Sequence, residues 1–121
     1  MYRYFLNNPC GKNVGDCVIR AISKVMDVSW VAAYKDLCDL GLRLCDLPNS
    51  NYVWSNYLRR KGFKRYAIEN CTVKEFCNEY PHGIYVLSTG SHIVACIDGL
   101  YYDAWDCGNE FIESYWRKEY L

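Results

Sequence analysis

The dipeptide Asp98-Gly99, which lies between two segments typical of β-strands, is the feature that most constrains the fold of this sequence. The segments are residues 92–97 and 100–105, and both are rich in β-branched and aromatic residues. An Asp-Gly pair in this position predicts a two-residue turn, which closes a tight antiparallel hairpin and sets the pairing of its strands. We therefore expect a hairpin over residues 92–105.

The predicted pairing brings two polar side chains to one face of this hairpin. Counting outward from the turn places Val94 opposite Asp103, and His92 lies on the same face two residues before Val94. His92 and Asp103 are then diagonal neighbours, close enough for a hydrogen bond between an imidazole and a carboxylate. A three-residue turn would reverse the parity and bring Asp106 onto the face of His92 instead, so Asp106 is the alternative partner.

The segments outside the hairpin predict an α+β fold in which N-terminal helices pack on an antiparallel β-sheet. Before Gly83 the apolar residues recur mostly at helical spacing, and after it the pattern becomes that of strands. Residues 111–120 are amphipathic and compatible with either a strand or a helix. Helices are predicted over residues 17–26, 30–40 and 51–61, and further strands over residues 63–68 and 84–88.

Capping residues mark both ends of the second helix and the start of a further short helix. Ser29 is a suitable N-cap for the second helix, and Gly41 is in position to end it. Thr72 and Glu75 have the spacing of a capping box, which starts a further short helix. This short helix has to end before Pro81.

The composition fits one domain, residues 1–121. A chain of 121 residues with 51% hydrophobic residues is long enough for one core and too short for two. Fourteen Lys and Arg residues balance fourteen Asp and Glu residues, so the protein has no overall field that would hold a nucleic acid or an anionic membrane. The basic cluster at residues 59–65 is interpreted as a solvated helix end. We expect neither a nucleic-acid nor a membrane partner.

The eight cysteines suggest a reduced protein rather than a disulfide scaffold. The apolar stretch from Met1 to Leu6 is too short for an export signal, so we expect a cytoplasmic protein with mostly free thiols. No two cysteines have the Cys-x-x-Cys spacing of a zinc site, and we expect no metal or other cofactor. Most of the cysteines are then small buried apolar residues.

Cys17 is the exception and a candidate nucleophile. It lies in the first turn of the predicted helix 17–26, where the helix N-terminus lowers the pKa of a thiol. A thiolate nucleophile also needs a rigid imidazole, oriented by a third polar group, to take up and return a proton. His92 and Asp103 are the candidates for these two roles. His82 is a competing base, but it lies in a predicted turn without an orienting neighbour, and we interpret it as a surface residue.

A cysteine at a helix start (Cys17), a histidine that opens a hairpin (His92) and an aspartate on the return strand (Asp103) together resemble papain-like cysteine peptidases. The chain is especially similar to bacteriocin-processing peptidases, which remove double-glycine leaders, and to small papain-fold proteins of bacteria and their phages. The similarity in element order covers nearly the whole chain. The resemblance implies Cys17 as nucleophile, His92 as general base and acid, and Asp103 as the residue that orients the imidazole. It also implies that the backbone N–H of Cys17 contributes to the oxyanion hole.

Two positions depart from the pattern of these peptidases. They usually carry a glutamine about six residues before the nucleophile to complete the oxyanion hole, whereas this chain has Gly11 there. Asn13 is the candidate to replace that glutamine, and Asn8 is the alternative. Val18 follows the cysteine where glycine or tryptophan is expected. Residues 16–21 are also similar to the nucleophile segment of ovarian-tumour-type deubiquitinases, a related papain-fold family.

These residues and the resemblance predict a thiol-dependent hydrolase, a cysteine peptidase or isopeptidase that acts on a peptide or protein substrate. Two alternatives remain open at this point. The same residues support a deamidase or an acyltransferase. A catalytically spent papain-fold binding protein, of phage or bacterial origin, would instead capture a host protein.

Overall fold

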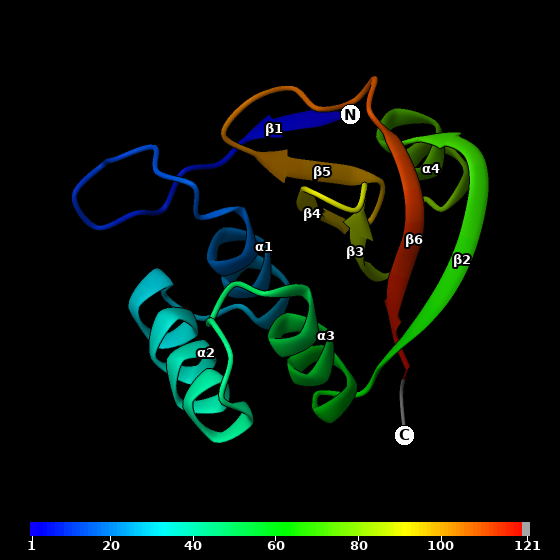
Figure 1. The fold of residues 1–121 in the computed structure, drawn as a ribbon. Helices are drawn as coiled ribbons and strands as arrows, with labels where there is room; N and C mark the ends of the chain where they lie inside the picture. The colour runs from blue at the N-terminus through cyan, green and yellow to red at the C-terminus, as the bar shows by residue number, and fades with distance from the viewer. Residues whose placement is uncertain (120–121) are drawn as a thin grey trace.

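We describe residues 1–119 of the chain from a computed structural model; residues 120 and 121, and with them the last position of the predicted segment 111–120, lie outside the described part. Residues 1–119 form four helices and a six-stranded sheet, so the predicted α+β class is confirmed (Figure 1). In chain order the elements are β1 (Tyr2–Tyr4), α1 (Cys17–Met26), α2 (Trp30–Leu44), α3 (Asn51–Arg60), β2 (Phe63–Thr72), α4 (Val73–Glu79), β3 (Ile84–Ser88), β4 (Ile93–Ile97), β5 (Leu100–Asp103) and β6 (Phe111–Lys118).

The sheet is mixed, which corrects the prediction of an antiparallel sheet. Its strand order is β1-β5-β4-β3-β6-β2. β1 pairs with β5 in parallel, with Tyr4 opposite Asp103, whereas the other neighbouring strands within residues 1–119 pair antiparallel. β1 has only three residues, too few to show an alternating pattern, and its partner strand lies near the other end of the chain. The sequence therefore carried no signal for this edge.

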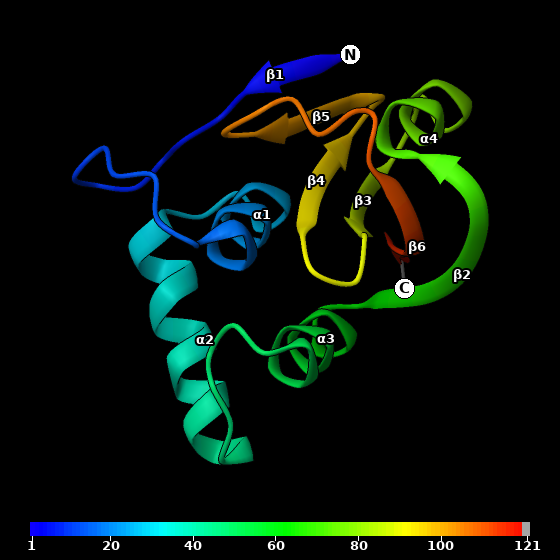
Figure 2. The ribbon, with the colours of Figure 1, turned by 45° about the horizontal axis from the view of Figure 1, so that its top comes forward.

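Helices cover both faces of the central strands. α1, α2 and α3 lie on one face of the sheet, and α4 lies on the other, near the strand β2 that curves around the outside (Figures 1 and 2). In β4, Ile93 and Ala95 join the core under α1–α3, whereas Val94 and Cys96 join the core under α4. Burial on both faces explains why residues 93–96 are buried without alternation.

α1 forms over the predicted residues because one of its sides is apolar. Val18, Ile22 and Val25 recur at helical spacing and are buried in the core. The helix ends where Asp27 adopts the left-handed conformation, with φ 53°. Because this apolar side packs against β4, the first turn of α1 lies beside the turn that precedes β4, and the two share one pocket.

α2 begins after the predicted N-cap, since the Ser29 hydroxyl accepts a hydrogen bond from the backbone N–H of Ala32. The predicted end at Gly41 is wrong, because the helix continues to Leu44 and Cys45 takes the left-handed conformation, with φ 55°. Gly41 is buried within the helix, and the loop that follows α2 folds back over it. The glycine is needed for this close approach rather than for a helix end.

The remaining local predictions are confirmed or extended. Thr72 and Glu75 form the capping box at the start of α4. β2 continues to Thr72 instead of ending at residue 68, because an irregularity between Ala67 and Cys71 lets it go on pairing with β6. Residues 111–118 form the strand β6, which decides between the two structures predicted for this segment.

The hairpin of β4 and β5 has the predicted register. Ile97 lies opposite Leu100, and Asp98 and Gly99 both have positive φ, as a two-residue turn of this kind requires. Extending the pairing by one residue beyond Ala95 and Tyr102 places Val94 opposite Asp103. The register prediction for this hairpin is therefore confirmed.

The cysteines within residues 1–119 are all free thiols. Cys77 and Cys96 are widely separated in the sequence, yet α4 and β4 bring their Sγ atoms to 2.7 Å in the core beneath α4. Sequence spacing did not indicate this pair, because it depends on how α4 packs on the sheet.

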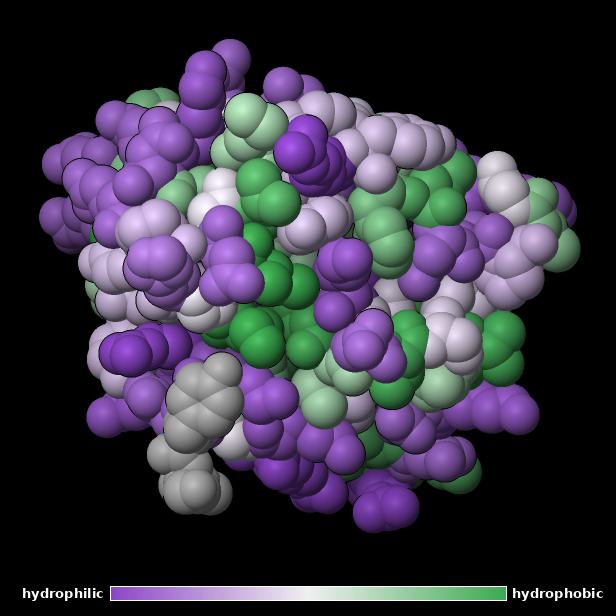
Figure 3. Space-filling model, turned by 180° about the vertical axis from the view of Figure 1, so that it is seen from behind, coloured by the Kyte–Doolittle hydropathy of each residue, from purple (hydrophilic) through white to green (hydrophobic). Residues whose placement is uncertain are grey.

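The molecular surface is mixed in polarity. Seen from behind, apolar side chains gather near the middle of the face, and hydrophilic side chains surround them (Figure 3). Leu42 and Leu47, near the end of α2, are among the most exposed large apolar residues. None of the helices in residues 1–119 is long and apolar enough to cross a membrane.

The Gly41→Ala substitution is expected to lower the free energy of unfolding, by about 1–3 kcal/mol. Alanine favours a helix over glycine by roughly 1 kcal/mol, but the added Cβ would lie 2.8 Å from the carbonyl oxygen of Asp46 and 3.3 Å from the Cα of Pro48. Urea denaturation measures the change. Leu42→Ala, on the exposed side of the same helix, is the matched control and should stay within about 0.5 kcal/mol. A Gly41→Ala protein more stable than the native one would contradict the close packing.

Candidate active site

Cys17 is the first residue of α1 and lines a surface pocket of about 370 Å³. Its side chain is half-buried, and the loop of residues 13–16 forms one wall of the pocket. His92, Ile93 and Trp105 line the pocket as well. The pocket therefore lies between the start of α1 and the open end of the β4–β5 hairpin.

His92 is held by the turn that joins β3 to β4. Its backbone N–H donates to the Thr89 hydroxyl at 3.1 Å, and its carbonyl accepts from the Thr89 N–H at 2.9 Å. The indole of Trp105 lies against the imidazole, with ring centroids 5.3 Å apart. These contacts fix the position of His92 directly before β4.

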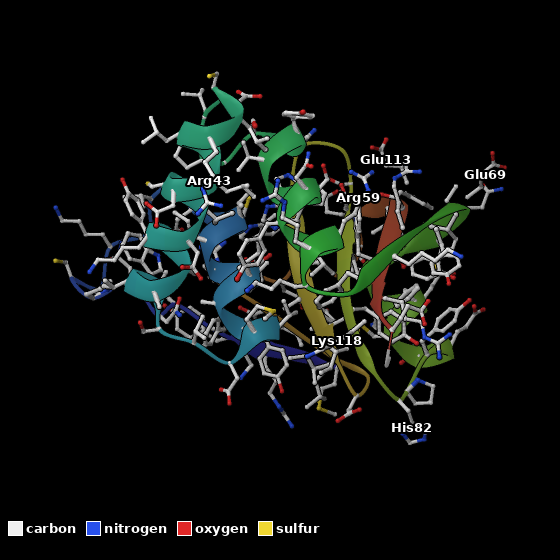
Figure 4. The ribbon with its side chains drawn as sticks, turned by 90° about the horizontal axis from the view of Figure 1, so that it is seen from below. Arg43, Arg59, Glu69, His82, Glu113 and Lys118 are labelled. Carbon is white, nitrogen blue, oxygen red and sulfur yellow. The ribbon has the colours of Figure 1, made fainter. Side chains whose placement is uncertain are left out.

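Asp103 provides the orienting carboxylate. Its Oδ2 lies 2.5 Å from His92 Nε2, and its side chain is fully buried. Asp106 does not take this role, because its Oδ1 accepts from the Tyr101 hydroxyl and from the backbone N–H of Gly108. His82 is exposed and lies at the margin of the molecule, away from the hairpin face (Figure 4). Of the candidates from the sequence, the structure thus brings Cys17, His92 and Asp103 together and leaves Asp106 and His82 apart.

The ionisation of Cys17 follows from its neighbours. Burial raises the pKa of the thiol, but three effects outweigh burial and leave the pKa lowered. These are the hydrogen bond with His92, a hydrogen bond from the backbone of Ile93, and the positive charges of His92 and Arg20. The start of a helix also favours the thiolate.

His92 and Asp103 are shifted toward their charged forms. Burial lowers the pKa of His92, but the hydrogen bonds with Asp103, Cys107 and Cys17 outweigh it and raise the pKa well above the usual value. Burial raises the pKa of Asp103, and the hydrogen bond and charge of His92 reverse this and lower it. These shifts all favour the charged forms, a thiolate at Cys17, an imidazolium at His92 and a carboxylate at Asp103.

A buried arginine that the sequence prediction did not assign a role joins this cluster. Arg20, one turn after Cys17, places Nη2 at 2.8 Å from Asp103 Oδ1 and Nη1 at 2.6 Å from Asp16 Oδ1. Asp16 Oδ2 accepts from the indole N–H of Trp30 at 2.8 Å. The Asp16–Arg20 spacing of four residues was visible in the sequence, but spacing alone does not separate a buried ion pair from an exposed one.

Backbone amides at the start of α1 are available to stabilise a negative charge. Asp16 stands at the N-cap position, yet its side chain makes no capping hydrogen bond and faces the protein interior. The positive end of the helix dipole and its free N–H groups therefore face the pocket.

Asn13, the predicted oxyanion-hole residue, lines the pocket. Asn8 does not line it, and its Oδ1 accepts a hydrogen bond from the backbone N–H of Cys10 at 2.8 Å. Asn49, Asn51 and Ser91 contribute further polar side chains to the pocket wall. The sequence offered no signal for these three, because they lie far from Cys17 along the chain.

Cys107 is a second thiol next to His92. It is fully buried, and burial raises its pKa to about 11, so at neutral pH it is a thiol and not a thiolate. One donor atom each from His92, Asp103 and Cys107 lie within 4.8 Å of one another, which is close enough to hold a metal ion. In the structure His92 Nε2 and Asp103 Oδ2 are paired with each other instead.

Comparison with known proteins gives no match: no protein-family model, curated protein or solved structure is significantly similar to the chain. A thiol of lowered pKa that shares a pocket with an imidazole held by a buried carboxylate is suited to nucleophilic attack on a carbonyl carbon.

Alkylation by iodoacetamide is expected to be much faster at Cys17 than at Cys10 and Cys45, which are exposed, when measured near pH 6 to 7. The lowered pKa of Cys17 and the raised pKa of His92 bound a pH window in which the ion pair exists. At pH values below this window the thiolate is protonated, so the rate of Cys17 alkylation should decrease. Peptide mass spectrometry after timed labelling measures each cysteine separately.

The His92→Ala substitution should remove this advantage. Without the imidazolium, only the backbone of Ile93 and the charge of Arg20 oppose the effect of burial, so the pKa of Cys17 should rise and labelling near neutral pH should slow toward that of Cys10. If Cys17 in the His92→Ala protein kept its native rate, the ion pair would not be the source of its reactivity.

Proposed function

We propose that this protein is a papain-like, thiol-dependent hydrolase that cleaves a peptide or isopeptide bond with Cys17, His92 and Asp103. The observation that carries the proposal is that Cys17 and His92 line the same surface pocket, while His92 Nε2 lies 2.5 Å from the buried carboxylate of Asp103. The order of elements, in which α1, α2 and α3 precede five of the six strands and the cysteine begins α1, also supports a papain-like fold.

In the first half of the reaction the Cys17 thiolate attacks the carbonyl carbon of the scissile bond. The carbonyl oxygen becomes an oxyanion, which the backbone N–H of Cys17 and the amide of Asn13 stabilise. The His92 imidazolium then donates its proton to the leaving nitrogen, the C–N bond breaks, and a thioester joins the acyl group to Cys17. Asp103 holds the imidazole in the orientation that this transfer requires.

In the second half a water molecule resolves the thioester. Neutral His92 takes a proton from the water molecule, and the water oxygen attacks the carbonyl carbon of the thioester. The C–S bond breaks, the carboxylic acid leaves and gives its proton to the solvent, and the thiolate–imidazolium pair is restored. No other reactant is consumed.

The Cys17→Ala protein is expected to lose turnover completely when it is incubated with a peptide library and the products are analysed by mass spectrometry. The matched control is Cys10→Ser, which replaces an exposed thiol in the loop before α1 and should cleave as the native protein does. A product heavier than its parent by one dalton at glutamine or asparagine would identify a deamidase instead. If native protein produced no change in any peptide while Cys17 stayed reactive, the binding-protein alternative would replace the hydrolase.

The Asp103→Asn substitution should reduce turnover on the order of 10² to 10⁴-fold, because an amide does not stabilise the imidazolium as a carboxylate does. Binding of a peptide substrate to the catalytically inactive Cys17→Ala background, with and without Asp103→Asn, separates loss of catalysis from loss of binding. Circular dichroism checks that the variant is folded. Native turnover in folded Asp103→Asn would show that the carboxylate has only a structural role.

A further inference from the structure

One buried guanidinium connects the helix that carries Cys17 to the strand that carries Asp103. The side chain of Arg20 is 5% exposed, and those of its two partners, Asp16 and Asp103, are 2% and 1% exposed. Such a charge is stable in the interior only when its hydrogen bonds are satisfied by carboxylates in good geometry. Arg20 meets this condition by giving one terminal nitrogen to each carboxylate.

The two oxygens of Asp103 have different partners. Oδ1 accepts from Arg20 Nη2 at 2.8 Å and from the backbone N–H of Ala104 at 2.7 Å. Oδ2 is left to His92, at 2.5 Å. Because Oδ1 is held at two points, the carboxylate cannot rotate about its terminal bond without losing both, and Oδ2 stays aimed at the imidazole.

The other terminal nitrogen of the Arg20 guanidinium, Nη1, holds the side chain of Asp16, the residue before the nucleophile. An aspartate at an N-cap usually accepts from the N–H groups of the first turn and so neutralises part of the helix dipole. Here Asp16 points inward, because Arg20 holds Oδ1 and Trp30 holds Oδ2. The amides of the first turn stay free for the Cys17 thiolate and for an oxyanion.

We propose that Arg20 is a positioning residue that performs both tasks at once: it aims Asp103 at His92, and it withdraws Asp16 from the start of α1. This rests on the proposed function for its effect on turnover, but its effect on Cys17 needs no substrate. The positive charge of Arg20 near Cys17 acts in the same direction, since it lowers the pKa of the thiol.

The Arg20→Lys variant tests this role, because lysine keeps the charge but presents a single ammonium in place of a planar fork that reaches both carboxylates. The matched control is Arg43→Lys, the same change on the exposed surface of α2 (Figure 4). Two quantities are measured for each variant: the pH profile of Cys17 alkylation, and kcat and KM for a cleaved peptide. Thermal unfolding reports any loss of stability separately.

We expect Arg20→Lys to move the acid limb of the Cys17 alkylation profile to higher pH and to lower kcat roughly a hundredfold with little change in KM. Arg43→Lys should match the native protein in both. A folded Arg20→Lys protein that is less stable, but has the native alkylation profile and native kcat, would overturn the proposal and leave Arg20 as a structural ion pair.

If Arg20→Lys does not fold, a second variant tests the proposal. Trp30→Phe removes the other donor to Asp16 and leaves Arg20 in place, and it should shift the acid limb in the same direction by a smaller amount. A native profile in Trp30→Phe would then overturn the proposal. Absence of turnover in the native protein, together with a shifted alkylation profile in Arg20→Lys, would refute the hydrolase and retain the positioning role.

Discussion

The packing of α1 against β4 is the contact on which the rest of the site depends. The apolar side of the helix, with Val18 and Ile22, is buried in one core with Ile93 and Ala95 of the strand. Burial of this kind is the main source of free energy in a small domain, and it leaves little freedom for the helix to slide or turn. The start of α1, with the Cys17 thiol, is therefore held near His92, which directly precedes β4.

The buried charges are arranged around this apolar contact so that each has a partner. Arg20 pairs with two carboxylates, and Asp103 divides its oxygens between Arg20 and His92. When Cys17 is a thiolate, the imidazolium of His92 faces a negative charge on either side. Unpaired, any of these groups would carry a large desolvation cost, so the ionised state of the cluster is a joint property of its members. The two cysteines next to His92 show how strongly position affects the pKa of a thiol, because the pKa of Cys17 is lowered and that of Cys107 is raised.

The same arrangement bears on the proposed hydrolase. Nucleophilic catalysis by cysteine requires a thiolate that exists before substrate arrives, and the site supports one through an imidazolium, a helix start and a nearby guanidinium. It also requires donors for an oxyanion, and the inward turn of Asp16 leaves the first amides of α1 open to the pocket.

The sequence by itself determined the features that depend on neighbouring residues. The start of α1 at Cys17, the caps at Ser29 and Thr72, and the two-residue turn at residues 98–99 all follow from local backbone preferences. The register of one hairpin was enough to put His92 and Asp103 on a common face. Only the tertiary structure decided the parallel edge at β1, the continuation of α2 past Gly41, and the bridge from Arg20 to Asp103, which are 83 positions apart. The physical reason is that each of these depends on which surfaces are buried together, and burial is set by the packing of distant segments rather than by the residues next in the chain.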